Sequence, residues 1–249
     1  MKNAGIKARF AIIFADPNLL HRAWLSERQA DAIFAPTRET YRQALAAGFD
    51  PSRTHFTGWP VRGQFYHADP SARDETLTRL GLDPRRFTVF AQGGGEGAAK
   101  FARTVESLLA LDNVQVILAA GTNEGLLKHF SGRPHIHAIP FTRQIAPFMQ
   151  AADVVMGKAG PNMLFETVTL GKPFIATAYI PGQEEVNLEF IQRYGLGWVA
   201  LNGKAQRTLI ESLVRDREKL SAMCESVERY RQMNTEATHQ IPQLVQNLF

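Results

Sequence analysis

The chain has 249 residues, 45% of them hydrophobic and 21% charged, which is the composition of a globular protein with one large or two small domains. Its net charge of +4 suits anionic small molecules or an anionic surface, while the absence of zinc-finger spacing and aromatic–basic interleaving argues against nucleic acid as a partner. The single cysteine, Cys224, excludes an internal disulfide, and no apolar run approaches the roughly 20 residues that span a bilayer. We therefore expect a cytoplasmic protein without a membrane span.

The first sixty residues alternate between strand and helix signals. Strands are expected at 8–15, 31–35 and 54–57, and a helix at 37–47. Thr37 can cap that helix and Gly48 can close it. Three strands are too few for a buried parallel sheet, so this part predicts the end of a lobe whose start lies outside the chain. Residues 61–70 contain Gly63 and Pro70, which break the pattern and predict a linker.

A longer series of alternating strands and helices follows. Strands are expected at 86–92, 114–120, 135–139, 154–156, 173–177 and 197–200, and helices at 98–110, 122–130, 142–151, 162–170 and 184–194. The chain from about 204 onward has a helical and highly charged pattern. This alternation predicts βαβ units and a parallel sheet with both faces covered, which binds ligands at the carboxyl ends of its strands.

A glycine-rich loop follows the expected strand at 86–92. It reads Gly-Gly-Gly-Glu-Gly and includes Gly94, Gly95 and Glu96. Glycines let the backbone approach a ligand closely and expose several amides to an anion. The alternative is a tight strand-to-helix turn without a ligand.

A second loop turns on Gly160 and Pro161 between a strand and a helix. Proline at the first helical position costs nothing, and the helix N-terminus directs free amides and a positive dipole end toward the loop. Glu166 falls on the same helix, at a distance that suits a ribose. The alternative is a capped helix with a solvated acid.

A third loop turns on Pro181 and Gly182 and presents Gln183, Glu184 and Asn187 near the next helix start. Such hydrogen-bonding side chains suit sugar hydroxyls, although acidic residues are also common at helix starts. Because the three loops share one end of one sheet, together they predict a nucleotide-sugar site.

Three stretches of the chain resemble a known family. "GWPVRGQF", "GGGEG" and "KAGPNMLFETVTLGKPFIATAYIPGQEEVN" resemble the GT-B glycosyltransferases that make monogalactosyl- and diglucosyl-diacylglycerol, and more distantly the peptidoglycan lipid-linked N-acetylglucosaminyltransferases. The resemblance implies an α/β fold of GT-B type. It implies a Rossmann-like donor-binding lobe with a parallel sheet at 63–233, a partial acceptor lobe at 1–62, and a C-terminal helix at 234–249 that returns toward the first lobe.

The resemblance also implies roles for the loop residues. Gly94, Gly95 and Glu96 would lie near the diphosphate and sugar, and Ala159, Gly160 and Pro161 would frame the phosphates. The backbone of Phe141 would hold uracil and Glu166 the ribose, while Gln183 and Glu184 would contact the sugar with Asn187 nearby.

The acceptor side of the family pattern is largely missing. The family's glycine-rich first loop, general base and lipid-binding segment precede the point that matches Ala8, so we expect them outside this chain. The stretch "ADPNLLHRAW" resembles the end of the first lobe, which makes Asp16 and His21 candidates for the base. A structural or surface role for both is the favoured alternative, so the catalytic residue stays unassigned.

The resemblance implies an inverting transfer of a hexose from a UDP-sugar to a lipid acceptor such as diacylglycerol. Helix dipoles and loop amides would stabilise the leaving diphosphate, so we expect no metal and no other cofactor. His135 and His137 alternate on one expected strand face, where packing is favoured over metal binding. Peripheral contact with an anionic membrane is a further expectation, from the cations Arg207, Arg215, Arg217, Lys219, Arg229 and Arg231, against the alternative of solvated helix faces.

Two other functions stay open. The chain could be a non-catalytic UDP-sugar-binding module that needs a separate acceptor subunit, which the missing part of the first lobe favours. It could also be a nucleotide-sugar epimerase of the same architecture, against which the Pro-Gly-Gln-Glu segment at 181–184 argues.

Overall fold

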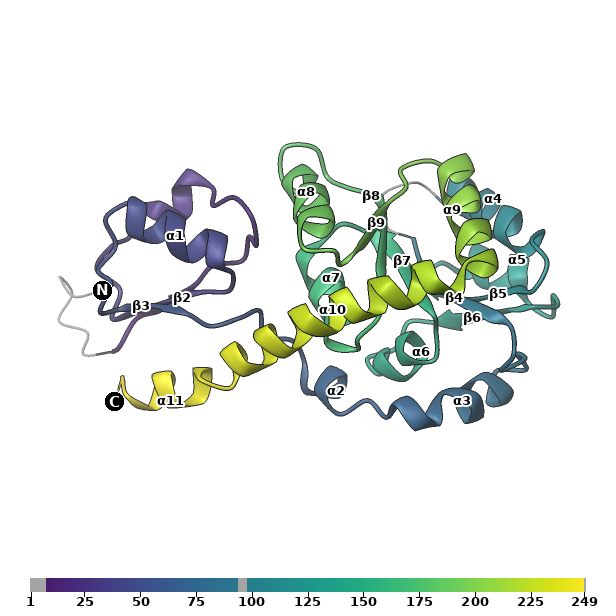
Figure 1. Cartoon of the computed structure of the whole chain (residues 1–249), viewed down its shortest axis with the longest axis horizontal. Coiled ribbons are helices and arrows are strands. Elements are labelled where there is room, and N and C mark those ends of the chain that lie inside the picture. The colour runs from purple at the N-terminus through teal and green to yellow at the C-terminus, as the bar shows by residue number, and fades with distance from the viewer. Residues whose placement is uncertain (1–7, 94–97, 249) are drawn as a thin grey trace. The chain divides into compact units, whose positions relative to one another are not determined.

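The structure is a computed structural model that describes residues 8–93 and 98–248. These residues group into two compact units, one of 8–60 with 231–248 and the other of 61–230. Each unit is built on its own parallel sheet (Figure 1).

The smaller unit contains the three strands that the sequence predicts. They are β1 (Ala11–Ile13), β2 (Ala32–Ala35) and β3 (Thr54–Phe56), parallel and in that order. Helix α1 (Arg38–Ala46) begins with the expected cap, because the Thr37 hydroxyl accepts from the amide of Thr40 while the Thr40 hydroxyl accepts from that of Thr37. Phe14, Ile33 and Phe49 form the centre of its core.

The C-terminal residues of the smaller unit pack on the segment after β3. Helix α10 (Arg217–Thr238) and the short α11 (Ile241–Gln246) account for most of the range 234–249, in which the sequence predicts one separate helix. The buried Asn234 accepts from the backbone amide of Trp59 at 2.7 Å and donates to its carbonyl at 3.1 Å. Gly58, with φ +67°, lies so close that a Cβ there would be 2.5 Å from the Asn234 carbonyl oxygen.

The larger unit has a six-stranded parallel sheet in the order β6-β5-β4-β7-β8-β9. Its strands are β4 (Phe87–Gln92), β5 (Val114–Gly121), β6 (Ile136–Pro140), β7 (Val154–Lys158), β8 (Phe174–Ala178) and β9 (Gly197–Val199). The chain builds outward from β4 through β5 to β6, then returns to β7 beside β4 and builds outward on the other side. The strand order therefore reverses between β4 and β7, which is where open parallel sheets bind ligands.

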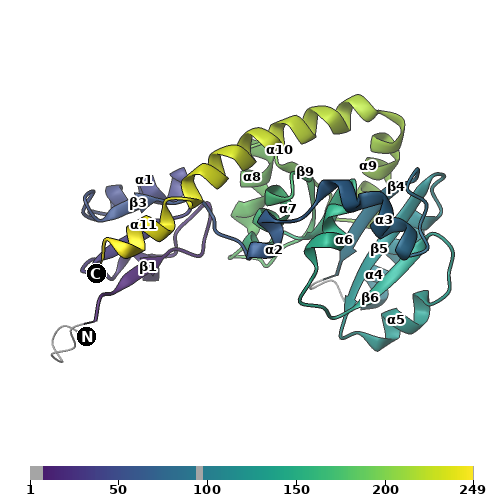
Figure 2. The same ribbon diagram turned by 90° about the horizontal axis from the view of Figure 1, so that it is seen from below.

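Helices cover both faces of this sheet, as the alternation predicts (Figures 1 and 2). They are α4 (Ala98–Leu109), α5 (Glu124–Phe130), α6 (Ala146–Gln150), α7 (Pro161–Thr169), α8 (Glu185–Arg193) and α9 (Gly203–Arg215). Val89, Val116 and Met156 share one buried cluster with side chains of α4, α5 and α9. In Figure 1, α6, α7 and α8 lie on the other side of the strands. No helix of the described chain is both long enough and apolar enough to cross a membrane.

The expected linker at 61–70 is partly helical, so that prediction is wrong. Gly63 begins α2 (Gly63–Tyr66) and Pro70 begins a 3-10 turn (Pro70–Ala72) that leads into α3 (Arg73–Arg79). Phe65 is buried, and the Gln64 side chain donates to the Arg143 carbonyl at 2.8 Å and accepts from the Ala146 amide at 3.1 Å. The segment folds because it buries an aromatic ring and satisfies backbone groups at the start of α6.

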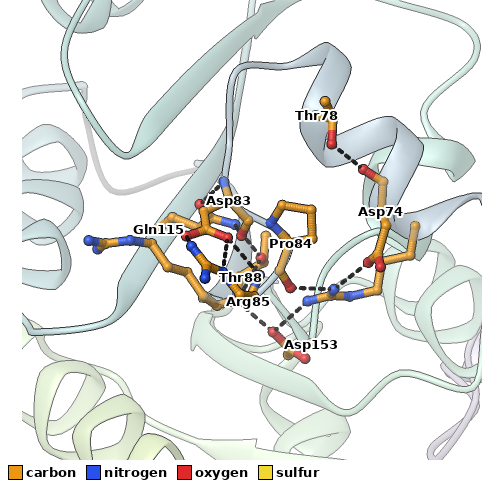
Figure 3. A network of polar contacts seen from close by, with 10 residues as sticks. Asp74, Thr78, Asp83, Pro84, Arg85, Thr88, Gln115 and Asp153 are labelled. Carbon is orange, nitrogen blue, oxygen red and sulfur yellow. Dashed lines mark hydrogen bonds and ion pairs between the residues drawn. The ribbon is translucent and has the colours of Figure 1, made fainter.

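A polar network fixes the amino end of the larger sheet, opposite to the carboxyl ends of its parallel strands (Figure 3). The buried Gln115 accepts from the Asp83 amide at 3.0 Å and donates to the Asp83 carbonyl at 2.8 Å and to the Thr88 hydroxyl at 2.9 Å. The Thr88 amide donates to Asp153 at 2.6 Å, and Arg73 lies 3.5 Å from the same carboxylate. The network joins the segment before β4 to β4, β5 and the residue that precedes β7.

Candidate functional site

A pocket of about 280 Å³ opens at the carboxyl ends of β4 and β7, where the strand order reverses. Its lining consists of Gln92, Gly93, Lys158, Gly160, Pro161, Asn162, Met163 and Glu184. These residues end β4, end β7, begin α7 and precede α8. The pocket therefore combines the three loops in which the sequence predicts a ligand.

The N-terminus of α7 forms one wall of the pocket. Gly160 is the residue before the first helical position and offers no side chain to cap the helix, and Pro161 has no backbone N–H. The amides of Asn162 and Met163 donate no hydrogen bond within the described part of the chain. Free amides and the positive end of the helix dipole make this wall suited to an anion.

A partly buried ion pair beside the first turn of α7 also lines the pocket. The Lys158 ammonium donates to Oε1 of Glu184, and Oε2 of Glu184 accepts from the Ile180 amide at 2.9 Å. Glu184 is 4% exposed, whereas the Lys158 side chain keeps 30% of its surface exposed. Lys158 was not among the predicted site residues, and the signal that could have found it is a lysine at the end of an otherwise buried strand, directly before Ala159-Gly160-Pro161.

Asn187 lies beneath the turn and does not line the pocket. It is 2% exposed and donates to the Ala159 carbonyl at 2.9 Å, while the Ala159 amide donates to Ala178 at 2.8 Å. Its side-chain oxygen has no partner in the residues that the structure describes. The structure thus gives Asn187 a role in holding the turn between β7 and α7, whereas Gln183 is exposed.

Glu166 lies one turn further along α7 than Met163, on the same side of the helix, and is not part of the pocket lining. Its Oε1 accepts from Nε of Arg62 at 3.1 Å and from Nη2 at 3.0 Å. Burial raises the pKa of Glu166, and the charge of Arg62 and its hydrogen bond partly oppose that rise. Arg62 was missed because its partner is 104 residues away in the sequence.

The loop after β6 holds the expected uracil position. Phe141 is 69% exposed and its amide donates to the Gly121 carbonyl at 2.9 Å, so the backbone group left for a ligand is its carbonyl. Gln64 fixes the same loop through Arg143, and Arg62 precedes α2. Residues 62–64 therefore connect the helix that carries Glu166 to the loop that begins at Phe141.

Other predicted residues lie elsewhere. Gly94, Gly95 and Glu96 fall outside the described residues. In the smaller unit Asp16 accepts from the Trp24 indole at 2.7 Å, and Nδ1 of His21 accepts from the Ala23 amide at 3.2 Å and caps a 3-10 turn at Arg22–Leu25. These contacts are the kind that a structural role requires, and such a role was the favoured alternative to that of a general base for both residues.

The two histidines considered for a metal do not share a strand face, which corrects the expected strand at 135–139. His135 has φ +62° and precedes β6, because a residue in the left-handed region cannot continue a strand. His137 lies within β6 and its Nδ1 is 2.9 Å from the Leu80 carbonyl oxygen, which is the packing role. No group of three or more potential metal ligands occurs in 8–93 and 98–248.

Comparison with known proteins identifies relatives along most of the chain. Residues 88–248 match the model of the glycosyltransferase family 28 C-terminal domain. Monogalactosyldiacylglycerol synthase 3 of Arabidopsis thaliana is 29% identical over 234 residues, which cover 88% of this chain and 50% of that protein. The processive diacylglycerol beta-glucosyltransferase of Bacillus pumilus is 28% identical over 210 residues, covering 82% and 54%. The chain thus spans about half the length of these relatives.

Solved structures share the fold at lower identity. Anabaena HepE in complex with UDP and glucose superposes with a TM-score of 0.60 at 15% identity, covering 96% of this chain and 72% of that one. MurG of Acinetobacter baumannii gives a TM-score of 0.65 at 17% identity, covering 99% and 68%. These likenesses confirm the predicted α/β fold of GT-B type, and the match over 88–248 confirms the family: this chain belongs to glycosyltransferase family 28 and carries its C-terminal domain.

Proposed function

We propose that the chain forms the donor-binding part of a transferase that moves a hexose from a UDP-sugar to a lipid acceptor such as diacylglycerol. The observation that carries the proposal is the pocket at the point where the strand order reverses, bounded by uncapped helix amides and by the Lys158–Glu184 pair. The names of the two curated relatives, which act on diacylglycerol, support this class of acceptor.

In this proposal the donor extends from the pocket along α7. The amides of Asn162 and Met163 bind the diphosphate, together with the glycine-rich segment of the sequence that begins at Gly93 and includes Gly94 and Gly95. The free oxygen of Glu166 accepts from the ribose hydroxyls, since Arg62 occupies only the other one.

The ends of the donor are assigned in the same way. The Phe141 carbonyl accepts from uracil, because its amide is already used within the chain. Gln183, exposed at the entrance of α8, contacts the sugar. Ala159, Gly160 and Pro161 frame the phosphates, and Asn187 supports that frame from below.

The transfer proceeds by in-line displacement. The acceptor hydroxyl attacks the anomeric carbon from the face opposite to the diphosphate, so the configuration at that carbon inverts. Amides fixed at a helix end stabilise charge without reorganising during the reaction, so the proposal needs no metal ion or other cofactor. The general base is not assigned to any residue of this chain.

Peripheral contact with an anionic membrane stays a prediction, and α9 and α10 give it little support. The range 203–238 carries seven basic and six acidic residues, so its charges are mixed along both helices. Attraction of a helix to anionic lipids requires a clear excess of cations near the surface. We propose a protein in the cytoplasm whose lipid contact depends on the acceptor more than on these cations.

Titration calorimetry with UDP tests the proposed site. We expect UDP to bind in the presence of EDTA, and absence of binding would overturn the proposal. Release of UDP from UDP-glucose or UDP-galactose, with diacylglycerol vesicles present, then separates a complete transferase from a donor-binding module. Tight UDP binding without turnover would identify the module, which needs a separate acceptor subunit.

A further inference from the structure

We propose that Lys158 binds the phosphate attached to the sugar and stabilises the negative charge that develops there when the nucleotide leaves. The inference rests on the proposed function, because it assigns one residue to one group of the proposed donor. It also changes the expected role of Glu184 from a contact with the sugar to a positioning residue for Lys158.

Lys158 is the one cationic side chain in the pocket lining formed by described residues. Its ammonium carries three N–H donors. One donates to Glu184, and the other two have no partner within the part of the chain that the structure describes. With 30% of its surface exposed, the side chain can present these donors and a full positive charge to a ligand in the pocket.

The position of the ammonium indicates which ligand group it meets. A Cβ built on Gly160 would lie 3.1 Å from Nζ of Lys158, so the ammonium is beside the first turn of α7. That turn also supplies the free amides of Asn162 and Met163. A point charge and a helix dipole end that converge on one place favour an anion over the neutral hydroxyls of a hexose.

Both carboxylate oxygens of Glu184 already accept hydrogen bonds within the protein. It is 4% exposed, its Oε2 accepts from the Ile180 amide, and its Oε1 accepts from the ammonium. A carboxylate that is buried and fixed by the backbone keeps a flexible lysine side chain in one orientation. The acid therefore orients the cation toward the phosphate.

The reaction that this arrangement assists is balanced without a further reactant. A bond forms between the acceptor oxygen and the anomeric carbon, and the bond from that carbon to the phosphate oxygen breaks. The bonding electron pair goes to the phosphate oxygen, so UDP leaves with one more negative charge, while the acceptor proton passes to solvent. Lys158 donates to the oxygen on which that charge appears, which stabilises the transition state more than the bound donor.

The test compares ligands that differ by one phosphate. UDP and UMP are titrated calorimetrically into wild type, Lys158→Met, Lys158→Arg and a control, Lys204→Met, whose lysine lies at the start of α9 outside the pocket lining. For Lys158→Met we expect UDP to bind about tenfold to a hundredfold more weakly, because a charge-assisted contact is lost, while UMP affinity changes less than about threefold. Lys158→Arg retains most of the UDP affinity, and the control matches wild type.

A double variant guards against misfolding. Lys158→Met alone leaves the buried Glu184 carboxylate without its counter-ion, whereas Lys158→Met with Glu184→Gln removes both charges. We expect the double variant to keep the wild-type melting temperature within a few degrees and still to lose affinity for UDP selectively. Equal losses for UDP and UMP, or no loss for UDP, would overturn the role of Lys158 and leave the proposed function standing. Failure of wild type to bind UDP would instead overturn the proposed function.

Discussion

Arg62 donates two hydrogen bonds to a single oxygen of Glu166, from Nε at 3.1 Å and from Nη2 at 3.0 Å. The second carboxylate oxygen has no partner among the described residues. The guanidinium also lies over the ring of Phe65, 5.2 Å from its centre, which limits how far it can move. The contact therefore fixes the orientation of the acid and leaves one edge of it free for a ligand.

Replacing Glu166 by alanine tests whether that edge binds a ribose. We expect UDP affinity to fall about tenfold to a hundredfold, because two hydroxyls lose a charged acceptor. Wild type should bind UDP more tightly than 2′-deoxy-UDP, and the variant should bind both equally, as measured by calorimetry. Glu211→Ala, on the exposed side of α9, serves as the control and should match wild type. Discrimination that survives in Glu166→Ala would remove Glu166 from the site.

Glu166 also predicts a pH dependence of stability. Burial raises its pKa above the unfolded value, so the folded state binds the proton more tightly than the unfolded state does. Its contribution to the free energy of unfolding is fully present below the unfolded pKa and is lost as the pH rises through the folded pKa. Glu166→Gln should remove this dependence. Urea unfolding of both proteins from about pH 4 to about pH 7 measures this dependence. Parallel curves of unfolding free energy against pH would show that Glu166 contributes no pH dependence and would contradict the prediction.

The βαβ alternation and the position of the pocket follow from local patterns in the sequence. Apolar runs, the Thr37 cap and the Gly160-Pro161 turn each act within a few residues, so the elements and the ends of the strands could be predicted. Parallel strands then bring successive loops to one edge without further information.

The contacts that complete the site could not be predicted in this way. Lys158 and Glu184 are separated by 26 residues, and Arg62 and Glu166 by 104, so neither pair has a local signature. The sequence placed Asn187 near a helix start as a possible sugar contact, whereas in the folded protein its side chain donates to Ala159 in the turn between β7 and α7. The segment at 61–70 resembled a linker because the ring of Phe65 and the side chain of Gln64 find their partners only in the folded lobe.

Asn187 supports a third prediction, on the turn between β7 and α7. Asn187→Leu keeps the side-chain volume but leaves the buried Ala159 carbonyl without its donor, which should lower the free energy of unfolding by about 1–3 kcal/mol. UDP affinity should also fall, because the turn leads directly into the amides of α7. Gln192→Leu, an exposed position on the same helix, is the control and should change stability by less than about 0.5 kcal/mol. Wild-type stability in Asn187→Leu would show that another group holds the turn.

Gln115 gives the complementary prediction, at the amino end of the sheet (Figure 3). Gln115→Leu removes three hydrogen bonds, leaves the Asp83 backbone groups without these partners and takes the Gln115 donor from the Thr88 hydroxyl, so we expect a loss of about 2–4 kcal/mol in the free energy of unfolding. The pocket lies at the carboxyl ends of the same strands, so the folded variant should bind UDP within about twofold of wild type. Calorimetry well below the melting temperature separates the two effects. A selective loss of UDP affinity in the folded variant would show that the two ends of the sheet are coupled, because distant and independent sites contribute additively.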